Sequence, residues 1–400
     1  MKRVVCVAVV MAVVIPACGS SSVGSKSSPS PLVSLSASAS GQSSPTPTAA
    51  LMVVYVRKKN SNPPQATVEL IDAAGKIAAN ADFSPPANPL MVGCVPIPPP
   101  AVRVAAGAVF FADSAGAIHK LDANGSTATV ANFPITQDQF LSFAVSPDGQ
   151  KLVAIVFSTP PVVNRTPAFG VDPYAPSGQW TLDLESAITN GPTTKVLHKD
   201  FGHNFPSTGP TLIAGWDDNG ELATVNSVVC VQNGIPSVEY TGNPLIHLGS
   251  DGTHLDTIGG SGCQAWDELH DGTILCGGSD WTSFSVRTRG GSQLWAQAGS
   301  FMQEPRLSPN GGGVSLNGDK SQIFLRGGSS PANVTAPGST IYLLGWFGNE
   351  SVVALKGGQK LGIVPVASPS TFKDLGVSVQ PACTACLPFP VSLIGMLGNP

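Results

Sequence analysis

The chain has 400 residues, of which only 12% are charged and 42% are hydrophobic, and its formal net charge is −4 at pH 7. A weakly acidic chain with so few charges has no basic field for nucleic acid or anionic lipid, so no nucleic-acid partner is predicted. The 44 glycines and 36 prolines indicate many turns.

The N-terminus has the organisation of an export signal. Lys2 and Arg3 precede an uncharged apolar run at 4–15, which is as long as a signal-peptide core and too short to span a bilayer as a helix. The next residues, Ile-Pro-Ala-Cys, resemble a bacterial lipobox, in which a small residue precedes a cysteine that is lipidated on sulfur. We therefore predict a lipoprotein signal peptide at 1–17 and lipidation of Cys18; an ordinary secretory signal with a chance cysteine is the alternative.

Residues 18–50 form the next predicted segment. After the cysteine they consist mainly of Ser, Pro, Thr, Ala and Gly, with Lys26 as the one charge. Such a composition lacks the apolar side chains needed to offset the ordering entropy of a fold, which predicts a disordered tether. The chain is thus expected to be exported and lipid-anchored to the extracytoplasmic face of the cell membrane.

Residues 51–400 carry a repeated pattern without long helical periodicity. A short apolar or alternating run leads into a tight turn with Asp, Asn or Gly, and another apolar run follows. The turns fall at intervals of 42, 71, 52, 39 and 37 residues, and a four-stranded propeller blade needs about 40–45. The glycines of these turns are Gly107, Gly149, Gly220, Gly272, Gly311 and Gly348.

The spacing predicts an all-β fold, a β-propeller with seven blades, or six as the alternative. A proline-rich loop at 158–178 lengthens one repeat between its second strand and the third, QWTLDLES. A second insertion follows Val225. Because a ring must close, residues 51–80 are expected to complete a blade with a C-terminal strand in PFPVSLIGM.

Two segments carry a family resemblance. SFAVSPDGQKLVAIV resembles the WD40-like repeat of bacterial TolB-type propellers, with its Pro-Asp-Gly turn between two strands. RGGSQLWAQAG is similar to a strand ending of quinoprotein-like propellers, which implies that Gly291 lies in a turn and that Trp295 packs between blades. The resemblance implies work at the cell envelope.

The six cysteines that remain after the signal and Cys18 predict disulfides in an exported chain. In CQAWDELHDGTILC, Cys263 and Cys276 lie at similar distances from the bend on facing strands, so a cross-strand disulfide is predicted. Cys383 and Cys386 form a Cys-x-x-Cys pair without a nearby helix, which favours a structural role, either together or with one partner elsewhere. The two remaining candidates are Cys94 and Cys230.

No local catalytic, metal or cofactor motif is found, so no catalytic residue, metal or cofactor is predicted. The closest cluster, HKDFGHNF, places His198, Asp200 and His203 in a predicted loop, for which a solvated connection between blades is favoured over a site. Asp217 and Asp271 are interpreted as turn residues that bond their own backbone. The tryptophans are interpreted as packing between sheets.

Two classes of function remain. The leading hypothesis is a membrane-tethered, monomeric propeller that acts as a binding or scaffold module for a protein or a cell-wall glycan. The alternative is an exported propeller enzyme, either a lyase or an enzyme that acts on glycans, with its active site at the central funnel. An enzyme should gather carboxylates or histidines from several blades at the axis.

Overall fold

The computed structural model describes the chain from Ala50 onward, with gaps. The described residues are 50–58, 64–87, 101–164, 174–203, 211–217, 222–226, 245–249, 253–260, 262–277, 282–299, 303–318, 320–379 and 391–398. The predicted signal peptide, Cys18 and nearly all of the predicted tether lie outside them. Within this part of the chain every regular element is a strand, and no helix is long and apolar enough to cross a membrane. The all-β prediction is confirmed.

The described strands form seven four-stranded antiparallel sheets, which we number in chain order. Sheet 1 contains β28 (Val391–Leu397), β1 (Leu51–Arg57), β2 (Ala66–Asp72) and β3 (Ile77–Phe83). Sheet 2 contains β4 (Val102–Ala105), β5 (Ala108–Ala112), β6 (Ala117–Leu121) and β7 (Thr127–Asn132). Sheet 3 contains β8 (Gln139–Val145), β9 (Lys151–Ser158), β10 (Trp180–Ile188) and β11 (Thr193–Gly202).

The remaining sheets follow the same order. Sheet 4 contains β12 (Thr211–Trp216), β13 (Leu222–Asn226), β14 (Leu245–Leu248) and β15 (His254–Ile258). Sheet 5 contains β16 (Gln264–Glu268), β17 (Ile274–Gly277), β18 (Ser283–Arg287) and β19 (Gln293–Ala298). Sheet 6 contains β20 (Gln303–Leu307), β21 (Gly313–Asn317), β22 (Ser321–Leu325) and β23 (Ala332–Asn333). Sheet 7 contains β24 (Ile341–Phe347), β25 (Ser351–Lys356), β26 (Lys360–Pro365) and β27 (Lys373–Ser378).

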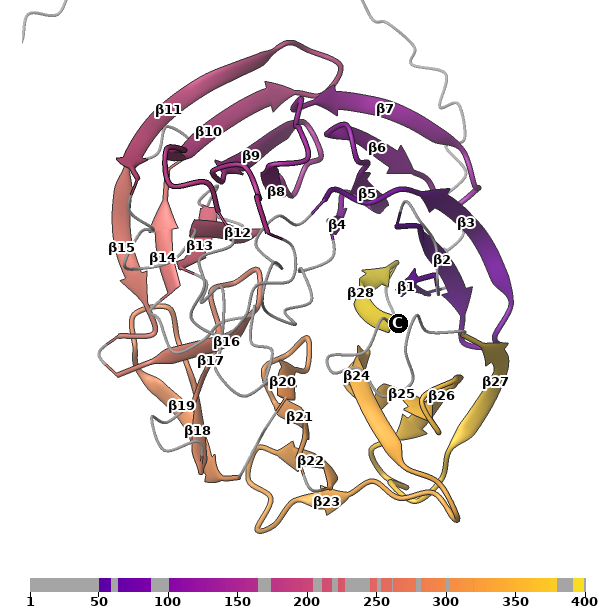
Figure 1. Cartoon of the computed structure of the whole chain (residues 1–400). Coiled ribbons are helices and arrows are strands. Elements are labelled where there is room, and N and C mark those ends of the chain that lie inside the picture. The colour runs from indigo at the N-terminus through magenta and orange to yellow at the C-terminus, as the bar shows by residue number, and fades with distance from the viewer. Residues whose placement is uncertain are drawn as a thin grey trace, which may run out of the picture. The chain divides into compact units, whose positions relative to one another are not determined.

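The sheets are arranged as a ring, with the first strand of each sheet toward the middle and the fourth at the rim (Figure 1). Each neighbouring pair shares a buried apolar cluster, and the last cluster joins sheet 7 back to sheet 1. This is the architecture of a β-propeller, in which radial repetition covers both faces of every sheet.

Coverage on both faces explains the sequence of the middle strands. β9 is buried at six consecutive positions from Leu152 to Phe157, whereas the outer strand β3 has only scattered buried positions. A strand that is covered on both faces reads as a continuous apolar run, because neither face meets water. The longest apolar runs in the sequence therefore belong to inner strands such as β8 and β9, which neighbouring sheets cover on both faces.

Ring closure joins the two ends of the described chain. β28 pairs antiparallel with β1, from Leu51 opposite Leu397 to Val56 opposite Val391. The prediction that residues 51–80 complete a sheet with a C-terminal strand is confirmed, although β28 begins only at Val391 and the preceding residues 380–390 lie outside the described part.

The two faces of the ring differ in their connections. Because neighbouring strands are antiparallel, all connections from first to second strands and from third to fourth strands lie on one face, which we call the turn face. The longest connection there is 366–372. On the opposite face, which we call the loop face, lie the described strand ends that flank the long connections 84–101, 159–179, 227–244 and 379–390. The predicted insertion between β9 and β10 is confirmed at 159–179, one residue later than expected.

The tight turns follow the predicted glycines. Gly107, Gly149, Gly272, Gly311 and Gly348 all have positive φ, between 63° and 80°, in turns between first and second strands. Glycine adopts this conformation without the steric penalty of a Cβ. Gly220 lies outside the described residues. Turns of neighbouring sheets touch on this face, as when the amide of Asn310 donates to Oδ1 of Asn349 at 3.0 Å.

Candidate functional site: the inner strands of the ring

Arg103 is a charged side chain on an inner strand. Arg103 belongs to β4, and its guanidinium carbon Cζ lies 5.7 Å from the ring centroid of Phe143 on β8. Its Nη2 donates a hydrogen bond to the carbonyl of Ile213 on β12 at 3.1 Å. The guanidinium thus connects sheets 2, 3 and 4 at the inner side of the ring. No local sequence pattern indicates this role, since Arg103 is the one charged residue in the apolar strand β4.

Three further polar side chains join one sheet to the first strand of the next. Ser142 Oγ accepts the amide N–H of Ile213 at 3.0 Å. Asn317 makes two bonds to the backbone of Leu343: its Oδ1 accepts the N–H and its Nδ2 donates to the carbonyl, both at 2.8 Å. The third is Asp267, and we call Ser142, Asp267 and Asn317 the sheet-joining side chains.

Asp267 is a carboxylate on the inner strand β16. Its Oδ2 accepts the amide N–H of Leu307 on β20 at 2.8 Å, and its Oδ1 lies 3.8 Å from Nη1 of Arg306. Both oxygens therefore face partners in sheet 6. A carboxylate held in this way serves as a structural acceptor that joins sheet 5 to sheet 6.

A buried ion pair lies on the turn face between sheets 4 and 5. Asp217 is 2% exposed and its Oδ2 lies 3.1 Å from Nη1 of Arg289, while Nδ1 of His270 lies 3.3 Å from the carbonyl of Trp216. Oδ2 of Asp217 thus faces the next sheet, and the predicted bonds of Asp217 to its own turn stay a prediction, because residues 218–221 lie outside the described part of the chain. Asp271 does bond its own turn: its Oδ1 accepts the amide of Thr273 at 2.8 Å.

His119 lies in a hydrogen-bonded row on the outer half of sheet 2. Its Nε2 is 2.9 Å from Oδ2 of Asp113, its Nδ1 is 3.2 Å from Oγ1 of Thr129, and its ring stacks on Phe111. Burial raises the pKa of Asp113, but hydrogen bonds from His119 and from two backbone amides outweigh it and hold the pKa below its usual value. The row fixes the β5–β6 turn against β7.

The expected loop around His198 is a strand. β11 continues to Gly202, and Nδ1 of His198 lies 2.5 Å from Oδ1 of Asp183 on the paired strand β10. Asp183 also accepts a hydrogen bond from Nζ of Lys195 at 2.7 Å. The Asp183 carboxylate on β10 pairs with Lys195 and His198 on β11, which explains why this charged, exposed segment forms the fourth strand of sheet 3. Asp200 and His203 do not join this cluster: Asp200 accepts the amide of Gly202, and His203 contacts the carbonyl of Gly178.

The Asp183 cluster should make stability sensitive to acid. Burial raises the pKa of Asp183, but its hydrogen bonds to Lys195 and His198 outweigh this and lower it. A lowered folded-state pKa gives stability that is present above the unfolded pKa of about 3.9 and is lost as the pH falls through the folded value. We expect Asp183→Asn to lower the urea midpoint at pH 7 and to differ less from the wild type below about pH 4. A difference that persists unchanged at low pH would contradict this origin.

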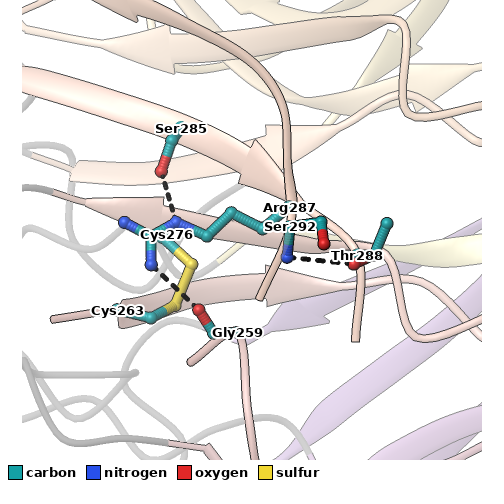
Figure 2. The surroundings of a disulfide bond; sticks show 7 residues. All are labelled: Gly259, Cys263, Cys276, Ser285, Arg287, Thr288 and Ser292. Atoms are coloured by element: carbon teal, nitrogen blue, oxygen red, sulfur yellow. Dashed lines mark hydrogen bonds between the residues drawn. A yellow bond between two sulfur atoms is a disulfide. The ribbon is translucent and has the colours of Figure 1, made fainter. Parts of the chain in front are cut away.

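Cys263 and Cys276 form the predicted disulfide (Figure 2). Both sulfurs are buried, the Cα atoms are 4.9 Å apart, and a Cβ on Gly259 would lie only 2.6 Å from Sγ of Cys263. Arg287 lies beside them and donates to the carbonyl of Gly259 at 2.9 Å. The bond thus ties the connection between sheets 4 and 5 to β17.

Loss of this disulfide should lower stability through the unfolded state. The two cysteines are separated by 13 residues, and closing a loop of this size contributes about 3 kcal/mol in the chain-entropy description. We expect Cys263→Ala with Cys276→Ala to lower the free energy of unfolding by about that amount. Denaturation with and without reductant checks it: the reductant should shift the wild type more than the double variant, and equal shifts would contradict the expectation.

The other predicted site residues have different outcomes. Cys18, Cys94, Cys230, Cys383 and Cys386 lie outside the described residues, so their roles stay predictions. Five of the six tryptophans are buried between sheets as predicted, and Nε1 of Trp295 donates to the carbonyl of Gly311 in the next sheet at 2.9 Å. Trp281 is not described. Among the described residues, no group of three or more His, Cys, Asp or Glu is arranged to hold a metal ion.

Comparison with known proteins finds likeness at the level of structure alone. No protein-family model matches the chain, and no curated protein matches it. The Dos1 propeller is 10% identical, with 84% of this chain and 88% of that chain covered and a TM-score of 0.44. YCF48 from Cyanidioschyzon merolae is 12% identical, with 72% and 89% covered and a TM-score of 0.42.

An enzyme is among the similar structures as well. The oligogalacturonate lyase from Vibrio parahaemolyticus is 8% identical, with 77% of this chain and 94% of that chain covered and a TM-score of 0.42. A fold does not by itself imply an activity, so the function is argued from the residues of this chain.

Proposed function

We propose that the chain is an exported lipoprotein whose propeller acts as a binding or scaffold module for a protein or cell-envelope partner. The export signal, the lipobox-like Ile-Pro-Ala-Cys and the tether composition support anchoring through Cys18. The ring supports the binding or scaffold role, because a rigid scaffold that carries variable loops is a common basis for recognition.

The observation that carries the binding role is how the described inner strands use their polar side chains. Arg103, Ser142 and Asp267 all bond backbone groups of another sheet. Groups committed in this way hold the ring together and are poorly placed to act as acid, base or nucleophile toward a substrate. This favours binding over catalysis at the described part of the axis.

The asymmetry of the two faces suggests where a partner binds. Among the described strands, those that flank the long connections end on the loop face, whereas the strand ends on the turn face are separated by short connections. The described base of the 159–179 connection is closed by a bridge between Val162 and Tyr174, and the neighbouring Val163 is 66% exposed. An exposed aliphatic residue on a supported loop suits contact with a partner.

In-cell photo-crosslinking tests this role. A diazirine amino acid is introduced at Val163 on the loop face or, as a matched control, at the exposed Lys151 on the turn face. We expect one discrete protein or glycan adduct from position 163, absent from position 151 and reduced when unlabelled wild-type chain is co-expressed as a competitor. No adduct from position 163, or the same non-competed adducts from both positions, would contradict the proposal.

A further inference from the structure

Exposed aliphatic side chains occur at the turns between third and fourth strands, on the turn face. In sheets 1 and 5 the first residue of this turn is polar and caps it. Oδ1 of Asp72 accepts the amides of Ala74 and Lys76, each at 2.9 Å, and Oγ1 of Thr288 accepts the amide of Ser292 at 3.2 Å. Such side chain to backbone bonds are the usual reason for Asp and Thr in turns.

Sheets 3 and 6 have aliphatic residues at the same turn position. The carbonyl of Ile188 accepts the amide of Gly191 at 2.7 Å, and that of Leu325 accepts the amide of Gly328 at 3.0 Å, as Asp72 does with Gly75. Ile188 is 64% exposed and Leu325 is 39% exposed. An aliphatic side chain cannot cap the turn and, when exposed, contributes little burial to folding. The side chains of Ile188 and Leu325 therefore contribute little to the stability of the fold.

Cations lie next to exposed aliphatic residues at two of these turns. The exposed Lys76 precedes Ile77, which is 42% exposed at the start of β3. The exposed Arg326 follows Leu325. An aliphatic side chain beside a long cationic one is typical of contact with a lipid surface, where the apolar group enters the interface and the cation stays at the headgroups.

The described chain begins on this same face of the ring. Leu51 begins β1 opposite Leu397, the last residue of β28, and this junction takes the place of a turn between first and second strands. The predicted tether from Cys18 therefore joins the ring at the turn face. If residues 18–50 form the predicted tether, its r.m.s. span would be roughly 30 Å, which would favour a position of this face near the anchored end.

We propose that the turn face rests on the membrane surface, with Ile77, Ile188 and Leu325 in the interfacial layer. The inference rests on the proposed function, because lipidated Cys18 brings the ring to the membrane. A few partly inserted side chains bind weakly alone, but a tether supplies a high effective concentration that makes weak contacts populated. The loop face then points away from the membrane toward its partner.

Photo-crosslinking of the full chain in living cells tests this orientation. A diazirine amino acid replaces Ile188 or Leu325, with Val163 on the loop face as the control that is at least as exposed. We expect phospholipid adducts from positions 188 and 325 and none above background from position 163. Adducts to a protein from positions 188 and 325, or equal lipid labelling from all three positions, would overturn the proposal.

A second variant set reports on the contribution of the aliphatic side chains. With the diazirine at position 77, Ile188→Ser combined with Leu325→Ser should lower the yield of lipid adduct about tenfold. The reason is that both substitutions remove aliphatic groups that the lipid interface would partly bury, which weakens the partition of the turn face into the interface. Val163→Ser should leave that yield unchanged. An unchanged yield in the double variant would overturn the proposal.

Fractionation of the same cells separates the two proposals. A chain that sediments with membranes but gives no lipid adduct from positions 188 and 325 retains its anchor and refutes the orientation alone. A chain absent from the membrane fraction refutes the anchoring and, with it, the orientation.

Discussion

Removal of β28 is expected to abolish cooperative folding of the ring. Val391–Leu397 is the first strand of sheet 1, and it pairs along β1 while it contacts β4 and β24 on either side. Its two terminal side chains belong to the apolar clusters that join sheet 1 to sheets 2 and 7. A chain that ends at residue 390 loses the closing pair and exposes both clusters, a loss comparable to the total stability of about 5–15 kcal/mol of an ordinary domain.

Urea denaturation followed by tryptophan fluorescence measures this effect. Truncation at 390 should give no cooperative transition, because an open ring leaves the edge of β1 unpaired. The matched control ends at Gly398, which retains all of β28 and should unfold like the full chain. A cooperative transition in the 390 truncation with an unchanged midpoint would contradict closure through this strand.

Replacement of Asn317 by leucine is expected to cause the largest loss among single polar substitutions in the described inner strands and their neighbours. Asn317 is buried, and it satisfies both the N–H and the carbonyl of Leu343 in the next sheet. Leucine has a similar size but leaves both backbone groups unpaired in the interior. Each unpaired buried group costs about 1–3 kcal/mol, so Asn317→Leu should lower the free energy of unfolding by roughly 2–6 kcal/mol.

Asn333→Leu is the matched control for this substitution. Asn333 lies on the outer strand β23 of the same sheet and is exposed, with Gln322 as its partner. Its replacement should change stability by about 0.5 kcal/mol or less, as is usual at the surface. If both variants unfold at the same urea concentration, the contact between sheets 6 and 7 does not depend on Asn317.

The parts of the fold that repeat could be predicted from the sequence. Gly149, Gly272 and Gly311 mark the same turn in sheets 3, 5 and 6, since a positive φ at that position selects glycine. The Cys263–Cys276 pair was predictable because the turn between the two residues sets them on facing strands. Ring closure followed from the need to leave no open edge.

The polar contacts between sheets could not be predicted. Asp267 and Asn317 stand singly in short strands, and their partners are backbone groups of a sheet formed later in the chain, which no local pattern reveals. Asp217 had the composition of a turn residue, yet its partner Arg289 lies in the next sheet. His198 was predicted to lie in a loop, but it lies on β11, where Asp183 on the adjacent strand pairs with it.

Fatty-acid labelling of cells that express the wild type or Cys18→Ala tests whether the propeller is held at the membrane through a lipid on Cys18. The predicted result is incorporation of the label by the wild type, which sediments with membranes, and an unlabelled Cys18→Ala chain in the soluble fraction. Val163→Ala serves as a control that leaves the lipobox intact and should behave like the wild type. A wild type that takes up no label, together with a Cys18→Ala chain that still sediments with membranes, would contradict the account.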